Sequence, residues 1–84
     1  MYVTIDIHYV YRDSRIMRGG NFPVNKANYQ KDKMKESAIV AYKFIQQIRS
    51  EQSEAMIEKV ICNGEDITEY LINNLQNSKN IFII

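Results

Sequence analysis

His8 and Cys62 are the residues whose chemistry could make this chain an enzyme, because they are its single histidine and its single cysteine. A cysteine nucleophile is usually activated by a histidine base, which a third group orients in turn. Asp6 lies on the same predicted strand face as His8, but the sequence identifies no oxyanion donor. We therefore expect a half-exposed strand histidine and a small buried thiol, with a small Cys/His enzyme as the alternative.

Metal and phosphate motifs are incomplete in this sequence. One cysteine and one histidine do not supply the ligands of a zinc site. Residues 63–66, Asn-Gly-Glu-Asp, gather oxygen atoms beside a glycine but lack the order and spacing of a calcium loop. Gly19-Gly20 lacks both the Lys-Ser/Thr of a P-loop and the spacing of a dinucleotide fingerprint. The sequence therefore predicts no catalytic residue, no metal and no cofactor.

Cationic residues in the amino-terminal half supply one candidate binding surface. Three arginines cluster on a tyrosine-bearing hairpin, and lysines at the start of a helix follow. The residues selected are Arg12, Arg15, Arg18, Lys31 and Lys35. Such cations could neutralise phosphates while Tyr2 or Tyr11 stacked on bases. Nucleic-acid binding is therefore the alternative function, although the total charge is near zero and no helix-turn-helix pattern is present.

A mixed polar and apolar patch supplies a second candidate surface. The even-numbered face of the first strand offers Tyr2, His8 and Val10 to solvent. Tyrosine and arginine are enriched at protein interfaces, and the chain has six tyrosines. The sequence therefore favours a small non-catalytic interaction protein with an unidentified protein partner. Small size without catalytic residues is typical of accessory proteins of phages and other mobile elements, but no family motif is present.

Composition indicates one globular domain spanning residues 1–84, with 45% hydrophobic and 25% charged residues. Residues 1–50 hold nine Lys/Arg against four Asp/Glu, and residues 51–84 hold two against six. These charges either form a basic face or intermix in space. The longest apolar run, residues 81–84, is far shorter than the roughly 20 residues that a bilayer requires. We expect no membrane segment and no signal peptide, and the lone cysteine favours a cytoplasmic location.

Two strands are predicted at the amino terminus. The odd positions of the first are apolar while its even positions are mostly polar: Val3, Ile5, Ile7, Tyr9 and Tyr11. A two-residue turn at Asp13-Ser14 would place Arg12 opposite Arg15. The same register would place Ile5 opposite Phe22, so apolar residues would face one another.

Glycine and proline leave more than one path open for the second strand. Gly19-Gly20 is an alternative position for the turn, or a bulge within the strand. Pro23 has no backbone N–H to donate, which predicts that the second strand lies at an edge of the sheet.

A long amphipathic helix is predicted from about Asn28. Apolar residues recur at intervals of four and three: Met34, Ala38, Ala41, Ile45 and Ile48. Asn25 or Asn28 would cap its start, and Asp32 suits the positive end of the helix dipole. Two heptads are too few for a coiled coil, so the stripe predicts a helix packed on a sheet.

The remaining residues predict a strand, a short helix and a final strand. Residues 56–62 form the strand, and Asn63-Gly64 forms a turn. Asp66 precedes Glu69 by three residues, as in a capping box, and begins a helix with Ile67, Leu71 and Leu75 on its apolar side. Residues 77–79 break this helix, and residues 80–84 return as a strand parallel to the third. The fold class is α+β, with a single mixed four-stranded sheet in the order ββαβαβ.

Self-association is expected from the apolar carboxyl-terminal run and from the small size of the chain. The run from Ile81 to Ile84 does not alternate, which is typical of a strand covered on both faces. Either the two helices cover opposite faces, or both lie on one face and a second subunit covers the other. Because so short a chain buries a limited part of its surface, we predict a homodimer.

Overall fold

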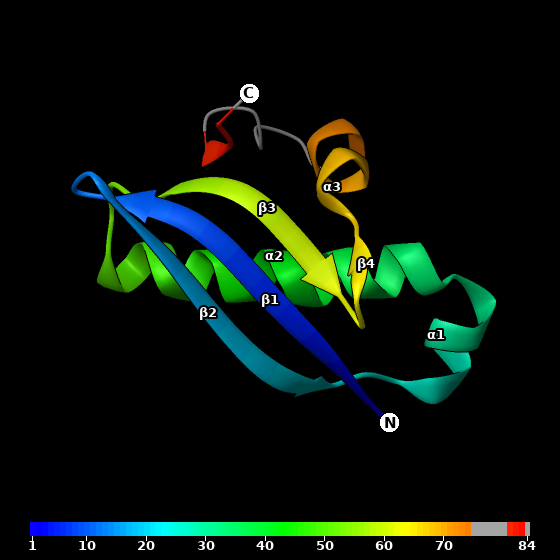
Figure 1. Ribbon diagram of the computed structural model, residues 1–84. Helices are drawn as coiled ribbons and strands as arrows, with labels where there is room; N and C mark the ends of the chain where they lie inside the picture. Colours follow the sequence, from blue (N-terminus) through cyan, green and yellow to red (C-terminus); the bar gives the residue numbers. More distant parts are fainter. Residues whose placement is uncertain (75–80, 84) are drawn as a thin grey trace.

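The computed structural model describes residues 1–74 and 81–83 of the chain. These residues form one four-stranded sheet, in the strand order β2-β1-β3-β4, and three helices (Figure 1). The strands are β1 (Tyr2–Tyr11), β2 (Ser14–Pro23), β3 (Met56–Cys62) and β4 (Glu65–Asp66). The helices are α1 (Lys26–Lys31), α2 (Lys33–Glu51) and α3 (Thr68–Asn74). The predicted α+β class with a four-stranded sheet and one long helix is confirmed.

The β1–β2 hairpin turns at Arg12 and Asp13, so the predicted Asp13-Ser14 turn is wrong by one residue. Both turn residues have positive φ angles, 50° and 66°. A two-residue turn of this kind matches the twist of the strands that it joins, and it requires positive φ at both positions. Ser14 is instead extended and lies opposite Tyr11. The register moves by two residues, which leaves every side chain on its predicted face.

Gly19 and Gly20 lie inside β2 and form neither a turn nor a bulge. Gly20 pairs with Ile5, and the ladder between the two strands continues without interruption. A Cβ atom on Gly20 would lie 3.1 Å from two ring carbons of Phe22. The missing side chain therefore gives space to the Phe22 ring, which packs against Phe44 with 4.8 Å between ring centroids. Pro23 ends β2, and β2 is an edge strand as predicted.

The predicted long helix is interrupted once near its start. The Asn25 side chain accepts a hydrogen bond from Asn28 N at 3.0 Å and caps α1, as predicted. Asp32 leaves the helical conformation, with φ at −153°, and its side chain accepts from Lys35 N at 3.2 Å. Asp32 therefore caps a second helix, α2. Its carboxylate accepts a hydrogen bond from a backbone N–H in the first turn of α2, which has no partner within the helix.

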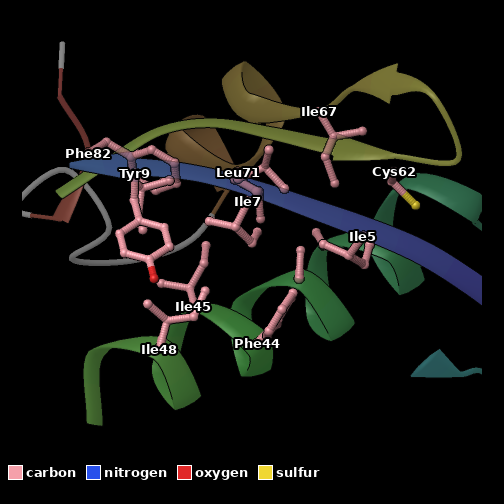
Figure 2. Close-up of a cluster of buried hydrophobic side chains, with 14 of the residues drawn as sticks. Ile5, Ile7, Tyr9, Phe44, Ile45, Ile48, Cys62, Ile67, Leu71 and Phe82 are labelled. Atoms are coloured by element: carbon pink, nitrogen blue, oxygen red, sulfur yellow. The ribbon is translucent and has the colours of Figure 1, made fainter. Parts of the chain in front are cut away.

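The apolar stripe of α2 faces the sheet, as predicted. Ala38, Ala41, Ile45 and Ile48 are buried, and Met34 is half-buried at the helix start. Figure 2 shows Ile45 and Ile48 below the strand that carries Ile5, Ile7 and Tyr9. The Tyr9 ring is also buried, and its hydroxyl donates to Gln52 Oε1 at 2.5 Å. This bond satisfies the polar end of an otherwise apolar side chain.

Strand β3 has its predicted bounds, and the predicted Asn63-Gly64 turn follows it with φ angles of 50° and 82°. Sequence reasoning missed the two-residue strand β4, which this turn brings back against Ile61 and Cys62. Helix α3 then begins at Thr68. The Asp66 side chain accepts from Thr68 N at 2.9 Å and from Thr68 Oγ1 at 2.6 Å. Asp66 therefore stabilises the start of the helix, but through Thr68 and not through the predicted capping box with Glu69, because the helix begins two residues after Asp66.

This contact makes the start of α3 sensitive to acid. Hydrogen bonds from the Thr68 hydroxyl and amide hold the pKa of Asp66 below its ordinary value of 3.8, and Lys59 adds a smaller effect in the same direction. A lowered pKa contributes stability above 3.8 that is lost as pH falls through the folded-state value. We expect Asp66→Ala to lower the free energy of unfolding by about 0.5–2 kcal/mol at neutral pH, as caps usually do. Urea unfolding should show a smaller difference from wild type at about pH 3 than at neutral pH.

The exposed neighbour Glu65 provides the control, because Glu65→Ala removes a carboxylate from the same short strand. A difference between Asp66→Ala and wild type that stayed constant over this pH range would contradict the assigned role of the carboxylate.

The carboxyl-terminal segment runs beside β3. Phe82 is 3% exposed and forms a parallel bridge with Ile57, and Ile83 N donates to Ile57 O at 2.8 Å. The predicted parallel direction is thus present at one bridge, but the four strands of the sheet all pair antiparallel, so the sheet is antiparallel and not mixed as predicted. The element order is ββααββα, which differs from the predicted ββαβαβ by the divided helix and by β4. Leu75, the helix break at residues 77–79 and both ends of the predicted strand 80–84 lie outside the described residues.

The two helices that pack against the sheet, α2 and α3, lie on one face of it. In β1 the odd residues from Val3 to Tyr9 are buried, while the even residues are exposed or half-buried. Helix α2 packs over β1 and β3, and α3 contacts both α2 and β3. In Figure 1 the long helix α2 passes behind the sheet, and no helix crosses in front of it. Of the two predicted arrangements, the one with both helices on one face is observed. No helix in the described part of the chain is long and apolar enough to cross a membrane.

Candidate interaction surface

The face of the sheet opposite α2 is left uncovered by the helices, and we call it the helix-free face. Strand pairing defines its members, since residues directly opposite each other in a ladder point to the same side. From β1 these are Tyr2, Thr4, Asp6, His8 and Val10. From β2 they are Arg15, Met17, Gly19, Asn21 and Pro23, and from β3 they are Met56, Lys59 and Ile61. The predicted patch of Tyr2, His8 and Val10 therefore lies on one continuous surface.

A hollow of about 460 Å³ opens at the middle of this face, around His8. Met17 lies beside His8 on β2, and Lys59 lies beside it on β3. Arg15 and Glu58 close one side of the hollow, with 3.7 Å between Arg15 Nε and Glu58 Oε1. The Arg15 side chain is 83% exposed, so this ion pair contributes little stability. The hollow thus combines both signs of charge with a thioether and an imidazole.

The most exposed apolar side chains of the sheet also belong to this face. Tyr2 is 68% exposed and Met17 is 56% exposed. Sequence reasoning selected Tyr2 but missed Met17, Met56 and Ile61. Met17 could have been found by continuing the strand pairing from His8, because the face of β2 is fixed by its partner. The broken alternation of β2 concealed this signal.

The three predicted arginines do not form one surface. Arg15 lies on the helix-free face, whereas Arg18 lies three residues later and therefore on the opposite side. Arg18 Nη1 lies 3.4 Å from Glu51 Oε1, and its guanidinium lies 5.9 Å from the centroid of the Phe44 ring. Arg12 occupies the hairpin turn, with its guanidinium 5.0 Å from the Tyr11 ring centroid. Strand alternation thus separates cations that are neighbours in the sequence.

The two predicted lysines lie at a third place. Lys31 and Lys35 line a hollow of about 480 Å³ at the junction of α1 and α2, together with Asp32 and Glu36. Acidic and basic side chains therefore alternate around this hollow. The intermixing of charges that the sequence left open is the arrangement found at this hollow.

His8 and Cys62 lie on opposite sides of the sheet. Cys62 pairs with Ile5 and is 5% exposed, with its side chain on the α2 side (Figure 2). His8 pairs with Lys59 on the helix-free face. The sheet therefore lies between the thiol and the imidazole, so His8 cannot serve as the base for Cys62. This geometry removes the Cys/His pair on which the enzyme alternative depended.

Metal ligands are also dispersed within the described ranges 1–74 and 81–83. No three histidine, cysteine or carboxylate side chains in these ranges lie close enough to hold one ion.

Comparison of the chain with protein-family models, curated proteins and solved structures finds no match. The helix-free face is therefore described by its own chemistry alone.

Proposed function

We propose that this chain acts as a protein-interaction domain and that the helix-free face binds its partner. The supporting observation is the concentration of exposed interface-type side chains on the one sheet face that lacks a covering layer. Tyr2 and Met17 are each more than half exposed there, and Arg15 lies on the same face two residues from Met17. Tyrosine, methionine and arginine are the residue types enriched at protein interfaces. The exposed residue types on the helix-free face therefore support a function by binding to another protein.

The charges on this face favour a protein surface over a nucleic acid. Asp6 lies beside Ile61 at the middle of the face, and Glu58 lies beside the hollow at His8. Both carboxylates would repel phosphates, while Arg18 is directed to the other side of the sheet. A partner protein can offer charges of both signs and an apolar centre, which would pair with this mixed surface.

Affinity capture from the native host, followed by titration of the purified captured protein, tests the proposal. Truncation of two exposed side chains in the variant Tyr2→Ala/Met17→Ala should weaken binding at least about tenfold, since exposed aromatic and methionine anchors carry much of an interface's energy. Ile39→Ala is the matched control, because Ile39 is 38% exposed on α2, away from the sheet face. Its affinity should equal that of wild type.

Two results would contradict the proposal. Equal affinities for the double variant and for Ile39→Ala would place the binding surface elsewhere. Retention of DNA or RNA at low salt, with a steep salt dependence that Arg15→Gln flattens, would favour the nucleic-acid alternative.

A further inference from the structure

We propose that the outer edge of β2 is a second interaction surface, at which two copies of this chain pair their β2 strands in antiparallel orientation. Strand β2 is the terminal strand of the sheet, with β1 as its neighbour on one side. Within the described residues no segment pairs with its other side. An edge of this kind offers unpaired N–H and C=O groups to another strand.

The phase of the β1–β2 ladder fixes which backbone groups face outward. In a two-residue hairpin the pair that flanks the turn, here Tyr11 and Ser14, exchanges hydrogen bonds. At the other end of the hairpin Val24 N donates to Met1 O at 2.8 Å, so Val24, like Ser14 an even-numbered residue, also directs its backbone N–H toward the first strand. Even residues of β2 therefore point their backbone groups at β1, and odd residues point theirs outward. The outward set is Arg15, Met17, Gly19 and Asn21, with the carbonyl of Pro23.

This edge carries few of the features that usually prevent strand pairing. The ladder with β1 runs over ten residues of β2, and the only register shift in β1 lies on its other side, against β3. Gly19 and Gly20 leave the centre without side chains. Arg15 is directed to Glu58 and Arg18 to Glu51, so the two cations turn to the faces of the sheet. Pro23 blocks pairing only at the end of the strand.

Self-pairing about a two-fold axis at Gly19 places compatible side chains opposite each other on the α2 side. On the α2 side, Ile16 would lie opposite the partner's Phe22, and Arg18 would lie opposite the partner's Gly20. Ile16 and Phe22 are half-buried in one copy, because α2 packs over β1 and β3. The added strand would therefore cover apolar surface that α2 leaves partly open. A shift that centres the axis on Arg18 would place this cation opposite its own copy, which is unfavourable.

Edge pairing also explains why the second copy does not need the helix-free face. A dimer that covered this face would occupy the surface that the proposed function assigns to a partner protein, whereas edge pairing leaves that surface free. The two-fold axis of an antiparallel pair is perpendicular to the sheet. Both sets of helices would then lie on one side, and the two helix-free faces would join into one continuous surface for a partner.

The test uses the full 84-residue chain made by chemical synthesis, with a methyl group on the backbone nitrogen of Met17. This methyl removes an outward donor and blocks the edge, while it leaves the β1–β2 bonds and all side chains unchanged. N-methyl-Tyr2 is the control, because the Tyr2 N–H faces away from β2, at a position before the first β1–β3 pair. Light scattering and sedimentation measure the mass, and circular dichroism verifies the fold.

We expect the unmodified chain and the N-methyl-Tyr2 chain to show twice the monomer mass of 9.9 kDa at micromolar concentration. The N-methyl-Met17 chain should remain folded, with a dimer dissociation constant raised at least about tenfold. A monomeric unmodified chain at high micromolar concentration would overturn the proposal. Dissociation on Ile61→Asp but not on N-methylation of Met17 would also overturn it, because the copies would then meet face to face. Partner capture by the N-methyl-Met17 monomer is measured separately, so either proposal can fail alone.

Discussion

The Ile45→Asp variant is expected to be largely unfolded at neutral pH. Ile45 is fully buried between α2 and the sheet, next to side chains of β1 (Figure 2). An aspartate there would place a carboxylate in an apolar environment without a partner, at a cost of about 3–5 kcal/mol in addition to the lost apolar packing. A domain of this length has a total stability of about 4–13 kcal/mol, so the change removes most of it.

Circular dichroism and urea unfolding provide the measurement. Ile39→Asp is the matched control, since it introduces the same residue on the same helix at a position that is 38% exposed. The control should unfold cooperatively near the wild-type midpoint. A cooperatively folded Ile45→Asp variant would show that the α2 stripe does not pack against β1.

Removal of residues 81–84 is expected to have the second largest effect. Phe82 is 3% exposed and belongs to the same core as Ile57 and Leu71, although it lies at the end of the chain. Loss of a buried phenylalanine side chain costs about 3–5 kcal/mol, and the deletion also exposes Ile57 and removes the hydrogen bond from Ile83 N to Ile57 O. The truncated chain should therefore unfold or aggregate at physiological temperature.

Two point variants separate packing from chain length in this prediction. Phe82→Ala should reproduce most of the loss in urea unfolding. Ile83→Ser should have little effect, because Ile83 is 45% exposed and contributes its backbone N–H. A stable truncated chain, or equal losses for Phe82→Ala and Ile83→Ser, would show that this segment does not complete the core.

Several elements were predictable because neighbouring residues alone specify them. The period of two in β1 and the stripe of α2 identify their buried faces without knowledge of the partner element. Asn63 and Gly64 both tolerate positive φ, so the turn after β3 was predicted at the correct residues. Asn25 as the cap of α1 follows the same local chemistry.

For other features the sequence allows two local conformations and does not show which one is more stable. Asp13 could occupy either position of the hairpin turn, and in the structure it occupies the second, with Arg12 and Asp13 both at positive φ. Asp32 could continue a helix or cap a new one, and it caps α2. The candidate cationic surface failed for a related reason. Arg15 and Arg18 are close in sequence, but an odd spacing in a strand directs them to opposite faces.

The sequence by itself determined which faces of β1 and α2 enter the core, because burial in these two elements follows hydrophobic periodicity. Only the tertiary structure decided that α2 and α3 share one face of the sheet, which leaves the other face open. Packing of α2 and α3 against the same side of the sheet leaves Tyr2, His8 and Met17 on the other side and separates His8 from Cys62. It also brings Gln52 to the Tyr9 hydroxyl across 43 residues of sequence. Contacts between distant elements set these outcomes, and no local pattern encodes whether two helices will cover the same face of a sheet or opposite faces.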